Sequence, residues 1–317
     1  MADTEHYVRE DVRGFLDMLK AMAGPEMDQV PIGEARGAYL AMSQMAEADA
    51  HDLAVVRDFV CPGPAGDIPL RLYDAKEHRE AGPVVMFYHG GGFVIGDLDT
   101  HNAFCTELAA KLDLPVVAVH YRLAPEAPFP AAPDDCEAAT RWVAGSPAEL
   151  GRQVTGLVTT GDSAGGNLTI VVTQALGDDP AAVPVLVQAP IYPVASAIEE
   201  TDSYKSFGDG FLLTARGMDF FNRSYAADPA SKRNYPILHE DHAKTPPTVL
   251  ITAGLDPLRD SGRDYAAHLI RNGVDVTYIE AKGNIHGFIT LRKALPSAQT
   301  DVETLIDAIK VMLERRA

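Results

Sequence analysis

Short runs of aliphatic residues recur along most of this chain, and stretches of helical character separate them. The runs cover residues 84–88, 116–120, 156–160, 185–188, 248–252 and 276–280. Because these runs are mostly apolar and most of them do not alternate between apolar and polar positions, they are typical of strands that helices cover on both faces. The intervening helices are predicted at 101–112, 134–144, 164–177, 258–272 and 298–315. This alternation predicts an α/β fold with a mostly parallel, doubly wound sheet of about eight strands.

The remaining segments are predicted to form additions to this sheet instead of a second globular domain. Residues 55–60 and 68–73 flank a turn rich in Pro and Gly and predict an antiparallel hairpin at a sheet edge. Residues 1–45 carry apolar side chains three and four positions apart, which predicts amphipathic helices. About 60 residues separate the fourth aliphatic run from the fifth, so an inserted element with a function of its own is expected there. We therefore expect helices at 1–45 followed by one domain at 46–317.

A serine lies between the third aliphatic run and the helix predicted after it. The segment Gly161-Asp162-Ser163-Ala164-Gly165 has the pattern G-x-S-x-G. Preceded by a strand and followed by a helix, this pattern predicts a nucleophile elbow, a sharp turn that exposes the serine at a helix N-terminus. The pattern alone is weak in a chain with 26 glycines, so the assignment depends on partners for Ser163.

A serine hydroxyl needs a base, and in enzymes with a nucleophile elbow the base follows the serine in the chain. Four histidines follow Ser163. His268 falls in a predicted helix, and His239 and His242 fall in a charged loop. His286 comes just after a predicted strand, where open α/β sheets place their chemistry. His286 is therefore the predicted base.

The acid that orients this histidine is expected in the loop after residues 248–252. Asp256 and Asp260 are both close to that position. Asp260 falls in the first turn of the predicted helix, where the helix dipole alone favours a carboxylate. Asp256 comes before the helix and is the predicted acid.

Three consecutive glycines follow the first aliphatic run, in His89-Gly90-Gly91-Gly92-Phe93. This HGGG pattern supplies oxyanion donors in lipases and esterases, because glycines let backbone amides turn toward an anion. The predicted donors are the amides of Gly91, Gly92 and Ala164. A plain glycine turn and a phosphate-binding loop are the alternatives, but the chain lacks G-x-x-x-x-G-K-[ST].

Charge and cysteine content restrict the partners and the compartment. The formal net charge of −18 argues against nucleic acids and anionic membranes as partners and suits a small-molecule substrate. Cys61, Cys105 and Cys136 show no C-x-x-C spacing and predict reduced core thiols. The N-terminus lacks the apolar core of a signal peptide, and no run reaches the ~18 apolar residues of a membrane span. A cytoplasmic protein without a metal or cofactor is expected, since H-E-x-x-H and Cys/His clusters are missing from the sequence.

Taken together, these motifs resemble the hormone-sensitive-lipase family of α/β-hydrolases, the bacterial family IV esterases. The resemblance runs from about residue 55 to the C-terminus and includes YRLAPE at 121–126, DPLRD at 256–260 and HGF at 286–288. Ala127 departs from the family, which usually has histidine there. The resemblance implies Ser163, Asp256 and His286 as a catalytic triad, in agreement with the residues taken one by one.

The same resemblance implies a cap over the site, formed by residues 1–45 and about 198–226. It also implies a possible homodimer through the edge strand near 276–280. Its candidates for substrate contact are Phe93, Tyr192, Phe207, Phe211, Leu212, Phe220 and Phe221. Asp162 and His101 acquire no catalytic role, and no partner is assigned to Asp162.

The leading hypothesis is a serine carboxylesterase that hydrolyses short- to medium-chain carboxylic esters through an acyl-enzyme on Ser163. An amidase or deacetylase, or a lipase of the same fold, is the alternative. A non-catalytic binding module, such as the plant hormone receptor that resembles this family, is disfavoured because that receptor has lost the histidine that His286 supplies here.

Overall fold

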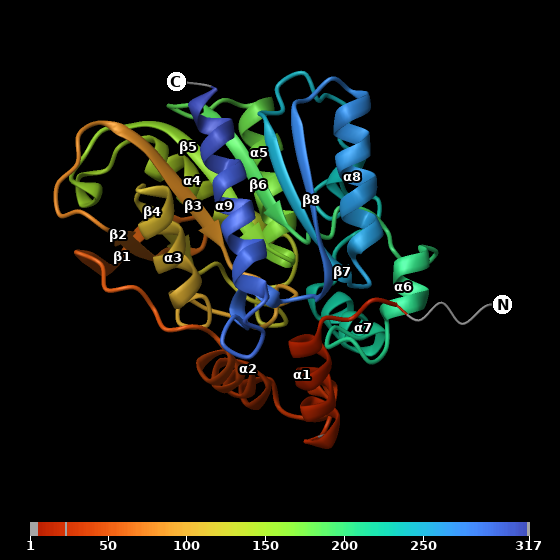
Figure 1. Ribbon diagram of the computed structural model, residues 1–317. Coiled ribbons are helices and arrows are strands. Elements are labelled where there is room, and N and C mark those ends of the chain that lie inside the picture. The colour runs from red at the N-terminus through yellow and green to blue at the C-terminus, as the bar shows by residue number, and fades with distance from the viewer. Residues whose placement is uncertain (1–5, 23, 316–317) are drawn as a thin grey trace.

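The chain folds around one mixed sheet (Figure 1). The computed structural model describes residues 6–22 and 24–315, so residues 1–5 and 23 of the predicted N-terminal helical region lie outside the described part. The strands are β1 (Val55–Gly63), β2 (Gly66–Asp74), β3 (Gly82–Tyr88), β4 (Val116–Val119), β5 (Val154–Asp162), β6 (Val185–Ile191), β7 (Thr248–Leu255) and β8 (Val276–Ile285). Every aliphatic run forms a strand, and five of these six strands extend beyond the run, β4 being the exception.

The strand order is β1-β2-β4-β3-β5-β6-β7-β8. β1 and β2 form the predicted antiparallel hairpin at one edge, and β2 is also antiparallel to β4. The pairs from β4 through β3 to β8 are all parallel. The prediction of a mostly parallel sheet of about eight strands is confirmed. The carboxyl ends of six parallel strands therefore meet at one edge, the region where such sheets bind ligands.

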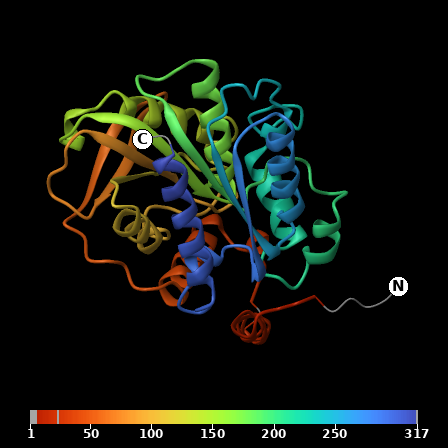
Figure 2. The ribbon, with the colours of Figure 1, turned by 45° about the horizontal axis from the view of Figure 1, so that its top comes forward.

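Helices cover both faces of this sheet. They are α1 (Glu10–Ala21), α2 (Ile32–Ala46), α3 (Asn102–Leu112), α4 (Ala131–Ala144), α5 (Ala164–Asp178), α6 (Asp202–Phe207), α7 (Ala215–Tyr225), α8 (Arg259–Arg271) and α9 (Ala298–Glu314). Successive side chains of β3 point to opposite faces: Phe87 packs in the core with α3 and α9, and Met86 packs in the core with α4 and α5. Figure 2 shows α9 against one face of the sheet.

The N-terminal helices and α7 gather at the carboxyl ends of the strands (Figure 1). Met27, in a short helical turn before α2, and Tyr39 of α2 line the same cavity as Met218 and Phe221 of α7. α7 belongs to the long connection between β6 and β7, the segment in which an inserted element was expected. Two segments that are distant in the sequence thus cover one end of the sheet.

A buried ion pair attaches the end of α2 to the loop that follows β8. Arg292 donates to Glu47 from Nε at 2.6 Å and from its backbone amide at 3.0 Å. The backbone amides of Lys293 and Ala294 donate to the carbonyl of Ala46, both at 2.9 Å. Both charged side chains are buried, at 2% and 5% exposure. Burial raises the pKa of Glu47 above its ordinary value even though the Arg292 cation opposes that shift.

Arg292→Met is expected to lower the free energy of unfolding by roughly 3–5 kcal/mol, because Glu47 and the nearby Glu107 would lose their buried cation. The measurement is urea unfolding at pH 7. Arg223→Met is the control, since Arg223 pairs with Asp219 on the exposed surface of α7 and should cost less than about 1 kcal/mol. Equal losses in the two variants would contradict this account of the buried pair.

Candidate active site

Ser163 lies at a sharp turn between β5 and α5. Its backbone has φ 57° and ψ −115°, a conformation that non-glycine residues rarely adopt. The turn is held by the Ser163 amide, which donates to the Ile191 carbonyl at 2.9 Å. A side chain on Gly165 would collide with the backbone carbonyl of Tyr88 at the end of β3, so only glycine fits there. The predicted elbow is present, and its strain is of the kind found at functional sites.

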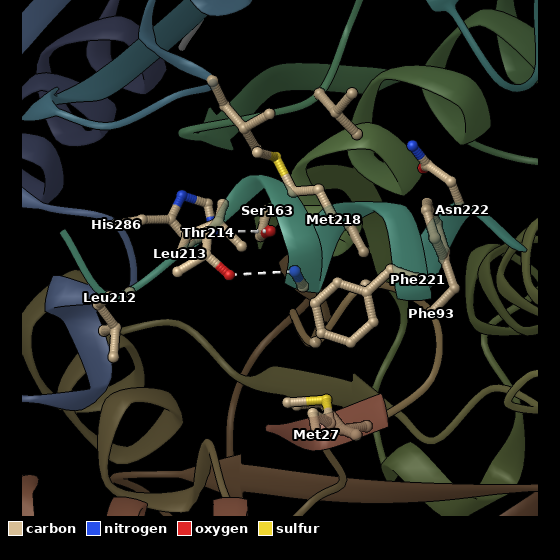
Figure 3. Close-up of a pocket in the computed structure, with 18 of the residues that line it drawn as sticks. Met27, Phe93, Ser163, Leu212, Leu213, Thr214, Met218, Phe221, Asn222 and His286 are labelled. Atoms are coloured by element: carbon tan, nitrogen blue, oxygen red, sulfur yellow. Dashed lines mark hydrogen bonds between the residues drawn. The ribbon is translucent and has the colours of Figure 1, made fainter. Parts of the chain in front are cut away.

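Ser163, His286 and Asp256 form one chain of hydrogen bonds. The Ser163 hydroxyl donates to His286 Nε2 at 2.8 Å, and His286 Nδ1 donates to Asp256 Oδ2 at 2.7 Å (Figure 3 shows Ser163 and His286). Asp256 is fully buried just after β7, and its other carboxylate oxygen accepts from the Leu258 amide at 2.8 Å. This arrangement allows the imidazole to take the serine proton while the carboxylate fixes its orientation.

Asp260, the alternative acid, faces away from this chain. It accepts hydrogen bonds from Arg259 and from the Ser203 amide of α6. Those contacts outweigh the effect of its burial and hold the pKa of Asp260 below its usual value. Asp260 therefore stabilises the contact between α6 and α8.

The amides predicted as oxyanion donors face the same cavity as Ser163. Gly91, Gly92 and Ala164 all line it. Across residues 6–22 and 24–315, the amides of these three residues have no hydrogen-bond partner within the chain. Gly91 and Gly92 have φ values of 114° and 59°, and a side chain on Gly92 would collide with the Phe221 ring. Free amides beside the serine are suited to binding a developing oxyanion.

The cavity next to Ser163 has a volume of about 320 Å³. Apolar side chains dominate its wall, and α7 supplies three of them, Met218, Phe221 and Tyr225 (Figure 3 labels the first two). Of the residues predicted to contact substrate, Phe93, Leu212 and Phe221 line this cavity. Met27, Tyr39, Met42, Leu213, Met218, Tyr225 and Leu258 also line it and were not predicted. The residues of α7 could have been found from their spacing of three to four positions, which places them on one helix face.

Four predicted pocket aromatics lie elsewhere. Phe207 is buried between Phe211 and Arg259. The two phenylalanines therefore pack against each other within the connection between β6 and β7. Tyr192 is fully buried behind the site, with its ring 4.5 Å from the His286 ring. Phe220 is partly buried, packs beside the Phe221 ring and against the core, and does not line the cavity. The prediction for these four residues is corrected, because aromatic content does not reveal which way a side chain points.

Asp162 is almost fully buried against residues 89–93, the predicted oxyanion loop, and it also lines the cavity beside Ser163. It accepts from the Gly90 amide at 2.7 Å and from the Tyr192 hydroxyl at 3.3 Å, and His101 Nε2 lies 3.1 Å from it. Burial opposes ionisation of Asp162, but His101, His286 and the Gly90 amide together outweigh burial and lower its pKa. Nearby, burial and the neighbouring histidines lower the pKa of His89 to about 3.

The other candidate histidines lie away from Ser163. His268 Nε2 is 2.8 Å from His242 Nε2, and His239 packs against His242. Within the described residues, no group of three or more Cys, His, Asp or Glu side chains is arranged to hold a metal ion. No helix in the part of the chain that the structure covers is long and apolar enough to cross a bilayer. Cys61, Cys105 and Cys136 are buried and unpaired with one another.

Comparison with known proteins identifies a matching fold family and relatives that are named as ester hydrolases. Residues 85–290 match the profile of the alpha/beta hydrolase fold family. The carboxylic ester hydrolase LipN of Mycobacterium tuberculosis is 40% identical over 272 residues, which cover 82% of this chain and 71% of LipN. The ethyl acetate hydrolase of Pseudomonas putida is 36% identical over 249 residues, which cover 77% of this chain and 78% of that enzyme.

A solved structure extends the similarity to nearly the whole chain. An ester hydrolase from the metagenome of Lake Arreo, solved with a derivative of bipyridine phosphonate, superposes with a TM-score of 0.91. It is 36% identical, and the match covers 96% of this chain and 98% of that one. The match to the family profile, the identity to these relatives and the shared fold agree, and the chain belongs to the alpha/beta hydrolase fold family.

Proposed function

We propose that this protein is a serine carboxylesterase that hydrolyses short- to medium-chain esters through an acyl-enzyme on Ser163. The observation that carries the proposal is the hydrogen-bonded chain from Ser163 through His286 to Asp256. The names of the relatives support the reaction class, since those relatives are ester hydrolases. We assign the chain to the hormone-sensitive-lipase branch on its HGGG and YRLAPE segments.

The reaction follows from the roles that these contacts allow. Ser163 Oγ attacks the ester carbonyl while His286 Nε2 takes its proton, and the amides of Gly91, Gly92 and Ala164 stabilise the oxyanion. His286 then gives the proton to the leaving alcohol as the C–O bond breaks. Water attacks the acyl-serine with His286 again as base, which releases the acid and restores the Ser163 hydroxyl.

The size and composition of the cavity support short acyl chains. A volume of about 320 Å³ is at the lower end of the range for small-molecule sites, and the wall is mostly apolar. An extended trough for long acyl chains would need more space. The Pseudomonas putida relative is named for hydrolysis of ethyl acetate, an ester with a two-carbon acyl group.

We further propose that residues 1–45 and about 198–226 act as a cap, because side chains from both segments line the cavity. A homodimer through residues 276–280 stays a prediction of the family resemblance, and the position of β8 at an edge of the sheet supports it. The three buried thiols support a reducing, cytoplasmic location.

Turnover is expected to be highest for p-nitrophenyl esters of about two to eight acyl carbons and to fall as the chain lengthens, because the cavity limits the acyl group. The measurement is kcat/KM across a series from acetate to palmitate. Intact mass should also show one phosphonyl group on Ser163 after treatment with a p-nitrophenyl phosphonate. A rate that rises toward long-chain triglycerides would favour the lipase alternative, and faster turnover of matched anilides would favour the amidase.

A further inference from the structure

Asp162 and His101 come from segments about 60 residues apart and meet behind the oxyanion loop. Both side chains are almost fully buried, at 3% and 1% exposure. Asp162 ends β5, and His101 directly precedes α3. Burying a charged group without compensation costs several kcal/mol, so such a pair needs a structural or functional reason. Neither side chain touches Ser163 Oγ through a hydrogen bond.

One oxygen of the Asp162 carboxylate holds the oxyanion loop by accepting a hydrogen bond from it. Oδ1 accepts from the Gly90 amide at 2.7 Å and is also the atom that lies 3.1 Å from His101 Nε2. A side chain on Gly90 would collide with the Asp162 carboxylate, so the loop and the carboxylate are in direct contact. The next two residues, Gly91 and Gly92, carry the amides assigned to the oxyanion. A shift of Gly90 would therefore move both donors.

His101 is itself fixed from the other side. Its Nδ1 lies 2.9 Å from the Thr100 hydroxyl, which donates to the Asp97 carbonyl and accepts from the Asp97 amide. The loop before α3 thus sets the position of the imidazole, and Nε2 of that imidazole faces the Asp162 carboxylate.

Tyr192 links the second oxygen of Asp162 to His286. Oδ2 accepts from the Tyr192 hydroxyl at 3.3 Å, and the Tyr192 ring lies 4.5 Å from the His286 ring. Tyr192 has φ 32°, and its amide donates to the Ile251 carbonyl at 2.7 Å, which holds the ring in place. The Asp162 carboxylate therefore contacts Gly90, which precedes the two glycines assigned as oxyanion donors, and Tyr192, which packs against the base His286.

We propose that Asp162 and His101 form a positioning unit for the proposed esterase reaction, which holds the oxyanion loop through Gly90 and supports His286 through Tyr192. The unit acts in the transition state more than in substrate binding, because the oxyanion amides bind the tetrahedral intermediate more strongly than the ester carbonyl. The proposal rests on the esterase function proposed above.

Asp162→Asn is expected to lower kcat by roughly 10- to 100-fold with KM changed less than about threefold, because a displaced oxyanion loop weakens transition-state binding. Asp162→Ala, which removes the acceptor for Gly90, should lose more than Asp162→Asn. The second measurement is the Ki of an alkyl trifluoromethyl ketone, which forms an oxyanion on the serine. Its Ki should rise in proportion to the loss of kcat/KM across the variants.

Two further measurements separate positioning from general damage. Hydrogen exchange of the backbone at 89–96 should speed up in Asp162→Asn, while exchange across α5 stays the same. Asp135→Asn is the matched control, since Asp135 is equally buried and pairs with Arg122. It should lower the melting temperature and leave kcat per active site unchanged. The double variant Asp162→Asn/His101→Gln should lose no more than the larger single loss if the two residues act as a unit.

Three outcomes would overturn the proposal: wild-type kcat in Asp162→Asn, a kcat loss with an unchanged ketone Ki, or an equal kcat loss in Asp135→Asn. A failure of the esterase function would look different. In that case the wild-type protein itself would neither turn over p-nitrophenyl butyrate nor take up the phosphonate on Ser163.

Discussion

Ser163→Ala is expected to lower kcat for p-nitrophenyl butyrate by roughly 10⁴- to 10⁶-fold. The variant removes the only atom that can form the acyl-enzyme, while the oxyanion amides and the cavity stay in place. The residual rate should therefore remain above the rate in water. The measurements are steady-state turnover and the loss of phosphonate labelling by intact mass.

The fold should be preserved in this variant, with a melting temperature close to that of the wild type, because alanine leaves the backbone contacts of the elbow unchanged. Ser224→Ala is the control. Ser224 lies in α7 and donates only to the Phe220 carbonyl within its own helix, so its kcat should stay within about twofold. Retained turnover in Ser163→Ala would move the nucleophile to another residue.

Asp256→Asn and Asp260→Asn together test which carboxylate serves His286. Asp256→Asn should lower kcat by about 10⁴-fold, because an amide facing Nδ1 favours the wrong imidazole tautomer and cannot stabilise the imidazolium. Asp260→Asn should change kcat less than about threefold, since Asp260 contacts Arg259 and the Ser203 amide instead of the imidazole. The two substitutions are chemically identical and lie four positions apart.

The measurement is kcat for p-nitrophenyl butyrate in both variants, together with thermal unfolding. Asp260→Asn is expected to be the one that lowers stability through its lost contact between α6 and α8. If Asp260→Asn lost activity and Asp256→Asn kept it, the assignment of the acid would be reversed.

The sheet and its main helices could be predicted because their signals are local. A strand buried on both faces must be apolar throughout, and a helix on that sheet must repeat its apolar positions every three to four residues. The ends of the strands were less predictable. β8 continues five residues beyond the aliphatic run to Ile285, where the chain is more polar. The short helix α6 was not predicted, since six residues carry too little periodicity.

The wall of the cavity could be predicted only in part. Phe221 and Leu212 line it, whereas Phe207 and Phe211 pack against each other and Tyr192 lies behind His286. Aromatic residues are common both in cores and in pockets, so their presence in a covering segment does not separate the two. The contribution of Met27 and Tyr39 depends on where two distant helices meet.

By itself, the sequence determined which residues can do the chemistry. Gly161 to Gly165, the HGGG segment, Asp256 and His286 each follow a strand, and a parallel sheet brings the carboxyl ends of its strands to one edge. That order predicted the contact between Ser163, His286 and Asp256 before any distance was known. Only the tertiary structure decided the partner of Asp162, because its contacts with Gly90, His101 and Tyr192 join three loops that no local pattern connects.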